Sequence, residues 1–288
     1  MRANMLEIVT RAITDSRAIP AISIYDFTTA QSVVAASEEA GRSIILLVPP
    51  KAAQGKNGMR FIRALRQLAN SSTTEVCIQL DHATDLALIR DSVDAGVDAV
   101  LADGSALSAS QNAGFVTEVR KIIGPDTSLE AELGAIAGDE DVSEKNEAGE
   151  KTDPREITSF LTASKADLLA VAVGNVHGSY KGAPQLDWPL IEMIRVQAAT
   201  VPMVLHGASG LSAADLARAG GAGIGKVNFN TELRTTIFKY INERSSAHSS
   251  DGMNMLAFLG GWGSCVREFT SETHRRLAPA TESCRSSG

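Results

Sequence analysis

The chain has 288 residues, of which 44% are hydrophobic and 21% charged, and its formal net charge is −7. This composition is typical of a globular protein with a substantial core, and the lack of a basic stripe argues against a nucleic-acid-binding surface. A small anionic ligand is still compatible with the charge, because a local cluster of donors can hold phosphate.

The N-terminal segment and the cysteines favour a cytoplasmic protein. Residues 1–17 have the pattern of an amphipathic helix and lack the apolar region of a signal peptide. No apolar run reaches the roughly 18 residues of a membrane-spanning helix. Cys77, Cys265 and Cys284 are far apart in the sequence, which fits neither a disulfide framework nor a cysteine zinc site.

Short β-rich runs alternate with segments of helical spacing along the chain. The runs are 21–27, 43–48, 76–81, 99–104, 128–134, 168–174, 202–207 and 226–231. Strand and helix alternating eight times predict a closed (β/α)8 TIM barrel, with the whole chain, 1–288, as one domain and the barrel in about the first 245 residues. An open doubly wound sheet is the alternative, weakened because no GxGxxG turn follows the first strand.

Two connections are longer than a barrel requires, and a helical extension follows the barrel. Residues 135–153 are acidic and poor in large apolar groups, which predicts an exposed, mobile loop, and 175–187 are rich in glycine and polar groups. Residues 245–252 are predicted to be a linker or turn. One or two terminal helices are expected in 253–277, where they could form an oligomer contact.

Three of the five histidines fall at or just beyond the ends of predicted strands: His82, His177 and His206. A parallel barrel brings all its strand ends to one rim, so the three imidazoles can converge there. Three imidazoles with one open position make a catalytic zinc site. The alternative is three unrelated helix caps or loop hydrogen bonds. His248 and His274 lie in the polar C-terminal region and are expected to be solvated.

Carboxylates gather at the same predicted rim. Asp81 precedes His82, Asp103 ends the fourth strand, and Glu130 and Glu132 point to one face of the fifth because strand side chains alternate. Glu130 fits a partner that orients a histidine as well as it fits a direct role. The acidic run 139–141 is either a solvated loop or part of the site.

Two turns after predicted strands, the first of them containing glycines, indicate an anion site. HGASG (206–210) follows the seventh strand, and NFNTE (228–232) follows the eighth and opens a helix. The loops after these strands commonly bind phosphate through backbone N–H groups and a helix N-terminus. Gly178, Ser179 and Lys181 add donors from the loop after the sixth strand.

Together, these stretches resemble the class II, zinc-dependent ketose-bisphosphate aldolases. The resemblance is carried by LDHATD, DGSALSASQN, LEAELGAIAGDED, VGNVHGSYKGAPQLD, VLHGASGLS and KVNFNTELR, in that order. It covers roughly residues 1–245. The HGASGLS stretch is most similar to the tagatose-bisphosphate branch, and GNVHGSYK resembles the fructose-bisphosphate branch.

The resemblance implies a role for each candidate residue. His82, His177 and His206 would bind one catalytic zinc per chain, with Asp103 and Glu132 at an alternative position and a second metal or a monovalent cation also possible. Asp81 would handle the proton on the aldehyde-derived oxygen, and Glu140 would be the base and acid at the enediolate carbon. The residues implied to bind substrate are Gly178, Lys181, Gly207, Ala208, Ser209, Asn228, Asn230 and Thr231.

The implied reaction is reversible cleavage of a ketose (bis)phosphate to dihydroxyacetone phosphate and an aldehyde, in a homo-oligomer (a dimer or tetramer). The chain departs from the family around AISIYDF and at VPPKAA, where Pro49 and Pro50 should reshape the distal part of the pocket. The arginine that would bind a second phosphate is not fixed by the sequence. The candidates are Arg267, Arg275 and Arg276.

Three other functions stay open from the residues. A Schiff-base aldolase needs a lysine within a strand, but strands one to seven contain none and Lys226 begins the eighth, away from the rim. A metal-dependent isomerase or epimerase could use the same rim. A non-catalytic barrel that supports an aldolase partner is the third, although all the candidate ligands are present.

Overall fold

A computed structural model describes residues 3–137, 145–147 and 149–279, and eight parallel strands form a closed barrel in it. Around the barrel the order is β1, β10, β9, β7, β5, β4, β3 and β2, returning to β1. The strands are β1 Ile19–Ser23, β2 Ile44–Val48, β3 Val76–Ala83, β4 Ala99–Ala102, β5 Ser128–Leu133, β7 Leu168–Val171, β9 Met203–Leu205 and β10 Ile224–Phe229. The prediction of a (β/α)8 barrel with C-terminal helices is confirmed.

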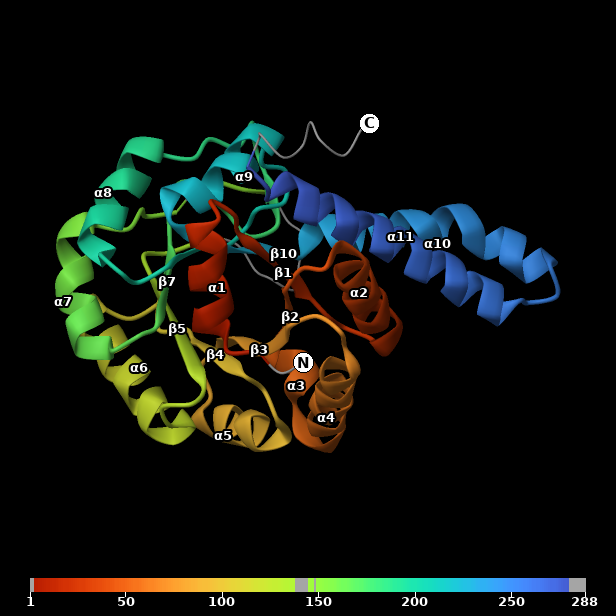
Figure 1. Cartoon of the computed structure of the whole chain (residues 1–288), viewed down its shortest axis with the longest axis horizontal. Coiled ribbons are helices and arrows are strands. Elements are labelled where there is room, and N and C mark those ends of the chain that lie inside the picture. The colour runs from red at the N-terminus through yellow and green to blue at the C-terminus, as the bar shows by residue number, and fades with distance from the viewer. Residues whose placement is uncertain (1–2, 138–144, 148, 280–288) are drawn as a thin grey trace.

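Helices surround the barrel as an outer ring (Figure 1). They are α2 Phe27–Ala40, α3 Pro50–Ala53, α4 Gly55–Ser71, α5 Leu86–Ala95, α6 Ala109–Ile123, α7 Pro154–Ser164, α8 Trp188–Ala198 and α9 Ala213–Ala219, the last followed by the short helix η1 Gly220–Ala222. Several begin at a polar residue whose side chain accepts a hydrogen bond from the first turn, including Asp26, Asp85, Ser108 and Asp153. These caps satisfy backbone N–H groups that have no partner within the helix.

The amphipathic segment at the start of the chain forms α1, Met5–Thr14, which packs against one end of the barrel (Figure 1). Its buried residues Met5, Ile8 and Val9 belong to one apolar cluster with inward-facing strand residues such as Leu47 and Val204. Because α1 covers the end where the strands begin, the opposite end, where the strands finish, is left for a ligand site.

The two long loops pair with each other through a second, two-stranded parallel sheet. It joins β6, Lys145–Asn146, to β8, Ser179–Tyr180. The two ends of the loop 135–153 are joined by a backbone hydrogen bond from Ala135 N to Glu150 O (3.2 Å), and a second one, from Thr152 N to Ala172 O (2.9 Å), ties the loop to the residue after β7.

The C-terminal helices form an antiparallel hairpin that projects beyond the barrel (Figure 1). Helix α10 runs from Thr231 to Ser250 and α11 from Met255 to Arg276. The prediction of a linker or turn at 245–252 was wrong for 245–250, which belong to α10, and the turn begins only at Asp251. Contact with α11 supports the helix: Tyr240 donates a hydrogen bond to the carbonyl of Phe258 (2.8 Å), and their ring centroids are 5.4 Å apart.

His274, predicted to be solvated, is instead buried between α11 and α2. Only 5% of it is exposed, and its Nε2 lies 3.1 Å from the hydroxyl of Ser37. His248, on α10, is half-buried beside Tyr240, with Nε2 3.2 Å from the phenol oxygen. The prediction was wrong because polar neighbours in sequence do not reveal a partner more than 200 residues away.

The burial of His274 predicts a loss of stability in mild acid. Burial, with the nearby charges of Arg42 and Arg17, lowers its pKa from 6.5 to about 4. Between pH 4 and pH 6.5, His274 therefore binds a proton more readily in the unfolded chain than in the folded one. Its contribution to the free energy of unfolding is complete above pH 6.5 and is lost as the pH falls towards 4. We expect wild type to lose about 2 kcal/mol more unfolding free energy than His274→Gln between pH 7 and pH 5. Denaturant unfolding of both proteins at both pH values measures this difference, and parallel pH profiles would contradict it.

Candidate active site

Three imidazoles meet at the end of the barrel where the strands finish. His82 lies on β3, His177 in the loop after β7, and His206 directly after β9. Their ring centroids are 5.1 Å apart for His82 and His177, 4.8 Å for His82 and His206, and 5.7 Å for His177 and His206. Glu132, on β5, adds a carboxylate, and one ligand atom from each of the four residues lies within 4.8 Å of the others. We call these four residues the rim cluster.

His82 is presented by an irregular part of β3. The register with β4 shifts between Leu80 and Ala83, and the φ angle of His82 is +43°. A positive φ is uncommon for residues other than glycine, and such backbone is concentrated at functional sites. A bulge of this kind re-aims a side chain relative to the regular pleat.

Asp103 fixes the orientation of the His82 ring. Its Oδ2 lies 2.7 Å from His82 Nδ1, and its Oδ1 accepts hydrogen bonds from the backbone N–H and hydroxyl of Ser105 (3.1 and 2.7 Å). Although burial opposes the charge, the hydrogen bonds from His82 and Ser105 hold the pKa of Asp103 well below its usual range. An ionised carboxylate only accepts, so the proton sits on Nδ1 and leaves Nε2 as the ligand nitrogen. The structure thus places Asp103 behind His82 and outside the rim cluster.

His177 is held by the backbone of both long loops. Its N–H donates to the carbonyl of Ala137 (2.8 Å), and its carbonyl accepts from the side chain of Asn146 (3.0 Å). The pairing of β6 with β8 lies directly beside it. The loop after β5 therefore supports a histidine supplied by the loop after β7.

His206 is fully buried and lies between two carboxylates. Its Nε2 is 2.9 Å from Glu130 Oε1, and its Nδ1 is 3.3 Å from Glu132 Oε2. Glu130 in turn accepts from Gln79 (2.8 Å) and from the ammonium of Lys226 (2.7 Å). The prediction that Lys226 lies away from the site was wrong: β10 begins at Ile224, so Lys226 is mid-strand, inside the barrel, and one carboxylate from His206.

The rim cluster suits a divalent cation. Glu132 Oε2 and His206 Nδ1 are both buried, and neither makes a hydrogen bond within the described part of the chain. Burial disfavours a charge on His206, but the hydrogen bond to Glu130 and the proximity of Glu132 raise its pKa to about 9. An environment that favours positive charge there would also favour a metal ion. Nitrogen-rich ligand sets of this kind suit zinc better than magnesium or calcium, which prefer oxygen ligands.

The two predicted proton carriers differ in what the structure shows of them. Asp81 is buried on β3, with 3% of its surface exposed, immediately before His82. Glu140, like the rest of the acidic run 139–141, lies outside the described residues.

A groove beside the rim cluster contains part of the predicted anion site. It is lined by Gly178, Tyr180, Ser209, Thr231 and Glu232, among others. Gly178 and Ser209 are close in sequence to His177 and His206, so the groove adjoins the rim cluster. The N-terminus of the 20-residue helix α10 opens into this groove, which favours an anion.

Glycine is required at position 207. Its φ is +61°, and a Cβ there would lie 1.9 Å from the carbonyl oxygen of Val176. The carbonyl of Gly207 also accepts a hydrogen bond from Tyr180 (2.9 Å). The backbones of the two loops that supply His177 and His206 therefore touch.

The remaining predicted substrate residues have varied surroundings. Ala208 is buried, and its N–H donates to the carbonyl of Asn228 (3.4 Å). Both polar side-chain atoms of Asn228 are buried without a hydrogen-bond partner among the described residues, which fits a side chain that awaits a ligand. Asn230 accepts from Tyr25 (2.9 Å), and Lys181 lies at the surface near Glu147 (3.3 Å).

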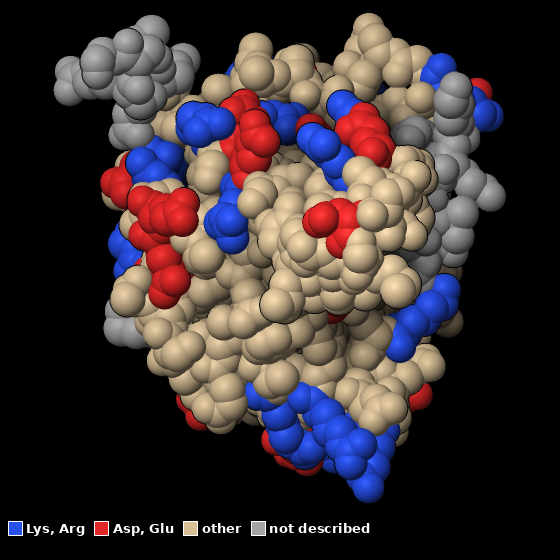
Figure 2. All heavy atoms as spheres, turned by 90° about the vertical axis from the view of Figure 1, so that its right-hand side faces the viewer, with Lys and Arg blue, Asp and Glu red and all other residues tan. Residues whose placement is uncertain are grey.

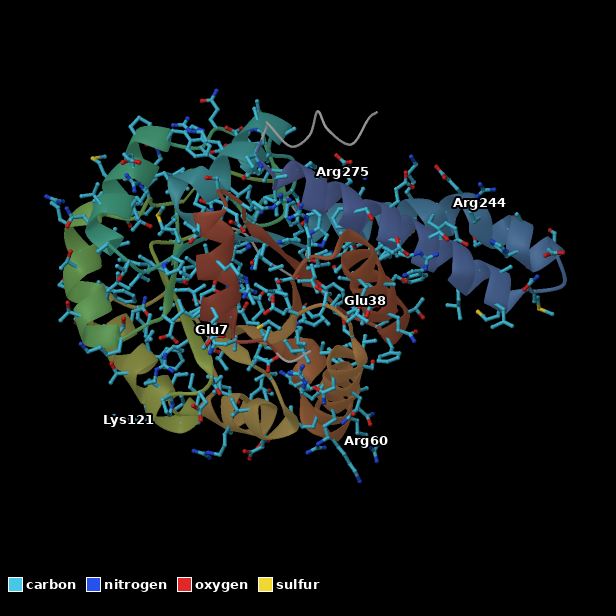
Figure 3. All side chains as sticks on the ribbon, viewed as in Figure 1. Glu7, Glu38, Arg60, Lys121, Arg244 and Arg275 are labelled. Atoms are coloured by element: carbon cyan, nitrogen blue, oxygen red, sulfur yellow. The ribbon has the colours of Figure 1, made fainter. Side chains whose placement is uncertain are left out.

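Of the candidate arginines, only Arg276 lies near the groove. Its guanidinium is 2.8 Å from Glu232 Oε1 and packs over Phe229. Arg275 pairs with Glu272 on the exposed side of α11 (Figure 3), and Arg267 donates to Ser264 one turn away.

A (β/α)8 barrel with ionisable side chains gathered where its strands end is the arrangement of a barrel enzyme. The chain belongs to the class II fructose-bisphosphate aldolase family, whose model it matches over residues 3–287. It is therefore an aldolase, a carbon–carbon lyase. This confirms the family resemblance of the motifs, and the family is generally metal-dependent.

Solved structures agree with this assignment. The YdjI aldolase from Escherichia coli K12 is 26% identical, with a TM-score of 0.86 over 98% of this chain and 99% of that one. A candidate fructose-1,6-bisphosphate aldolase from Coccidioides immitis is 25% identical, with a TM-score of 0.86 over 95% and 96% of the two chains. The fructose-bisphosphate aldolase of Campylobacter jejuni, 17% identical, shares the fold (TM-score 0.77, over 94% and 93%). Among the described residues, none of the helices is both long and apolar enough to cross a membrane.

Proposed function

We propose that this aldolase uses zinc to cleave a ketose phosphate reversibly into dihydroxyacetone phosphate and an aldehyde. The observation that carries the proposal is the rim cluster, in which three imidazoles and a carboxylate present ligand atoms within 4.8 Å of one another. Zinc bound there would act as a Lewis acid towards the carbonyl and hydroxyl oxygens of the substrate. His82, His177 and His206 would hold it, and Glu132 would provide a further or alternative ligand.

The proposed proton transfers fall to two carboxylates. Asp81, next to His82 on β3, would take the proton of the C4 hydroxyl as the C3–C4 bond breaks. Glu140 would return a proton to C3 of the three-carbon fragment. Glu140 follows Ala137 by three residues, a span of at most about 10 Å, and Ala137 is hydrogen-bonded to His177. The chain is therefore long enough for Glu140 to reach the site.

The groove beside the rim cluster would hold the phosphate of dihydroxyacetone phosphate. The backbone at Gly178, Gly207, Ala208 and Ser209 would donate hydrogen bonds to the phosphate or let it approach closely. Thr231 would contact the phosphate from the start of α10. Asn228 would bind the substrate between phosphate and metal. Asn230 and Lys181 complete the proposed set. Arg276 is the candidate for a second phosphate, although its pairing with Glu232 must then rearrange.

We further propose a homo-oligomer, a dimer or tetramer, formed through the C-terminal hairpin. Its end carries the exposed apolar side chains Met253, Met255 and Leu256, and Phe238 is exposed on α10. Much of the surface at this end of the molecule is uncharged (Figure 2). Exposed apolar side chains that lie close together are typical of protein contact sites.

A substrate panel tests the proposed reaction. The purified protein would be incubated with ketose mono- and bisphosphates of different stereochemistry, and the aldehyde and dihydroxyacetone phosphate trapped separately. We expect both products in equal amounts from at least one sugar. An isomerase or epimerase would retain all carbons in one product, and a non-catalytic barrel would release nothing. Borohydride added with the substrate should leave the protein unlabelled, and covalent trapping would instead support a Schiff base.

A further inference from the structure

Lys226, on β10, is a fully buried lysine within the barrel. Its Nζ lies 2.7 Å from Oε2 of Glu130 on β5, and β9 and β7 separate these two strands on one side of the barrel. The ion pair therefore crosses the barrel interior. Lysine is almost never fully buried unless it is paired, and the proposed reaction gives this one no part.

The carboxylate of Glu130 links Lys226 to the rim cluster. Its Oε2 accepts from both Lys226 and Gln79, while its Oε1 lies 2.9 Å from His206 Nε2. All four side chains are completely buried.

The contacts of Glu130 determine which nitrogen of His206 is available as a ligand, because Lys226 and Gln79 donate to its Oε2 and leave its Oε1 facing His206 Nε2. Because a carboxylate only accepts hydrogen bonds, Nε2 must carry the proton that points at Glu130. The other nitrogen, Nδ1, lies 3.3 Å from Glu132 Oε2, on the side of the rim cluster. Metal-binding histidines commonly have this carboxylate partner behind them, which fixes the ring and makes the ligand more basic.

We propose that Lys226 is a positioning residue for the metal site, which holds Glu130 as the oriented carboxylate that directs His206 Nδ1 into the rim cluster. The inference rests on the proposed function, because it assumes that the rim cluster binds zinc. It assigns no nucleophilic role to Lys226, whose ammonium is engaged by Glu130 inside the barrel.

The alternative is that the ion pair serves only the fold. Replacing both partners of a buried ion pair with neutral side chains is often harmless to stability, whereas removing one partner leaves a buried charge and is destabilising. A purely structural pair should therefore be replaceable by a neutral pair without effect on zinc binding. If the pair instead orients His206, replacing it with a neutral pair should weaken zinc binding.

The test uses the full-length chain, stripped of metal and titrated with zinc against a chromophoric chelator. We expect Lys226→Met to weaken zinc binding by about 10–100-fold, the usual effect of losing an outer partner of a metal ligand. The double variant Lys226→Met/Glu130→Gln should recover the Tm of the metal-free protein but bind zinc at least about tenfold more weakly than wild type. If zinc affinity recovered together with Tm, Lys226 would act on folding alone and the proposal would be overturned.

A matched control comes from a second buried ion pair away from the rim cluster. Arg66 Nη1, on α4, lies 2.6 Å from Oδ2 of Asp98, which directly precedes β4 and also accepts a hydrogen bond from the backbone N–H of Ile78 on β3. Arg66→Met should lower Tm but leave zinc affinity unchanged, which separates loss of stability from loss of the ligand.

Imidazole ¹⁵N spectra of the zinc-loaded protein provide a second measurement. In wild type we expect His206 to carry its proton on Nε2 and zinc on Nδ1, and this signature should be lost or mixed in Lys226→Met. An unchanged His206 signature in that variant would also overturn the proposal. Failure of wild type to bind zinc would instead refute the proposed function itself, so the two failures are distinguishable.

Discussion

Replacing His206 with alanine should remove bound zinc and reduce cleavage by at least about 10³-fold, because Lewis-acid stabilisation is worth several kcal/mol and each 1.36 kcal/mol is a factor of ten. His206 supplies Nδ1 to the rim cluster from a fully buried position, and alanine leaves no donor atom there. Wild type should purify with about one zinc per chain and lose its activity to a strong chelator. Metal analysis by mass spectrometry and a coupled cleavage assay on the same samples measure both effects.

His248→Ala is the matched control for this experiment. His248 is a half-buried histidine on α10 whose neighbours are Tyr240 and Phe258, and it has no place in the rim cluster. Zinc content and cleavage should both be unaffected by its loss. Full turnover by metal-free wild type, or by the His206 variant, would end the case for a metal-dependent reaction.

Replacing Asp81 with asparagine should reduce cleavage and condensation by about 10²–10⁴-fold, the usual contribution of a positioned acid–base group. The side chain keeps its shape but can no longer accept the C4 hydroxyl proton. Exchange of the C3 proton of dihydroxyacetone phosphate with solvent involves no aldehyde, so it should largely survive. Mass spectrometry of dihydroxyacetone phosphate after incubation in D₂O, beside the cleavage assay, measures the two activities separately.

Glu140→Gln should give the opposite pattern and lose proton exchange along with turnover. Zinc content should remain that of wild type in both carboxylate variants. If the Asp81 variant lost exchange as completely as cleavage while keeping its zinc, the assignment of the two proton transfers would be wrong. Asp81 would then support His82 or serve C3 itself.

The barrel and the convergence of the histidines could be predicted because they depend on short-range patterns. Alternation of strand and helix fixes the barrel, and the barrel fixes which strand ends share a rim. Period-two alternation was enough to place Glu130 and Glu132 on one face of β5. Their different partners, His206 Nε2 and His206 Nδ1, could not be read from that alternation.

What the sequence could not show depends on contacts between distant segments. Lys226 looked like the polar start of a strand, because its partner Glu130 is 96 residues away and meets it only when the barrel closes. The serines in 245–250 resembled a linker, since serine is a weaker helix former than alanine or leucine, but packing against α11 outweighs that preference. The signal that could have revealed the network behind His206 is a lysine two residues before Asn228, a predicted substrate residue, and so on the same face of the strand.

The backbone at His82 also decides which substitutions there can be interpreted. With φ at +43°, this position suits glycine or asparagine, and a β-branched side chain would be strained regardless of its chemistry. His82→Asn is thus the informative replacement, because asparagine tolerates left-handed backbone and removes only the imidazole. A valine at position 82 would disturb the irregular segment of β3 and displace Asp81 with it, so a loss of activity in that variant would say little about metal binding. In a mutational scan of this rim, the effect of losing the imidazole at position 82 should therefore be taken from the asparagine variant. An average over all substitutions would include those that strain the backbone.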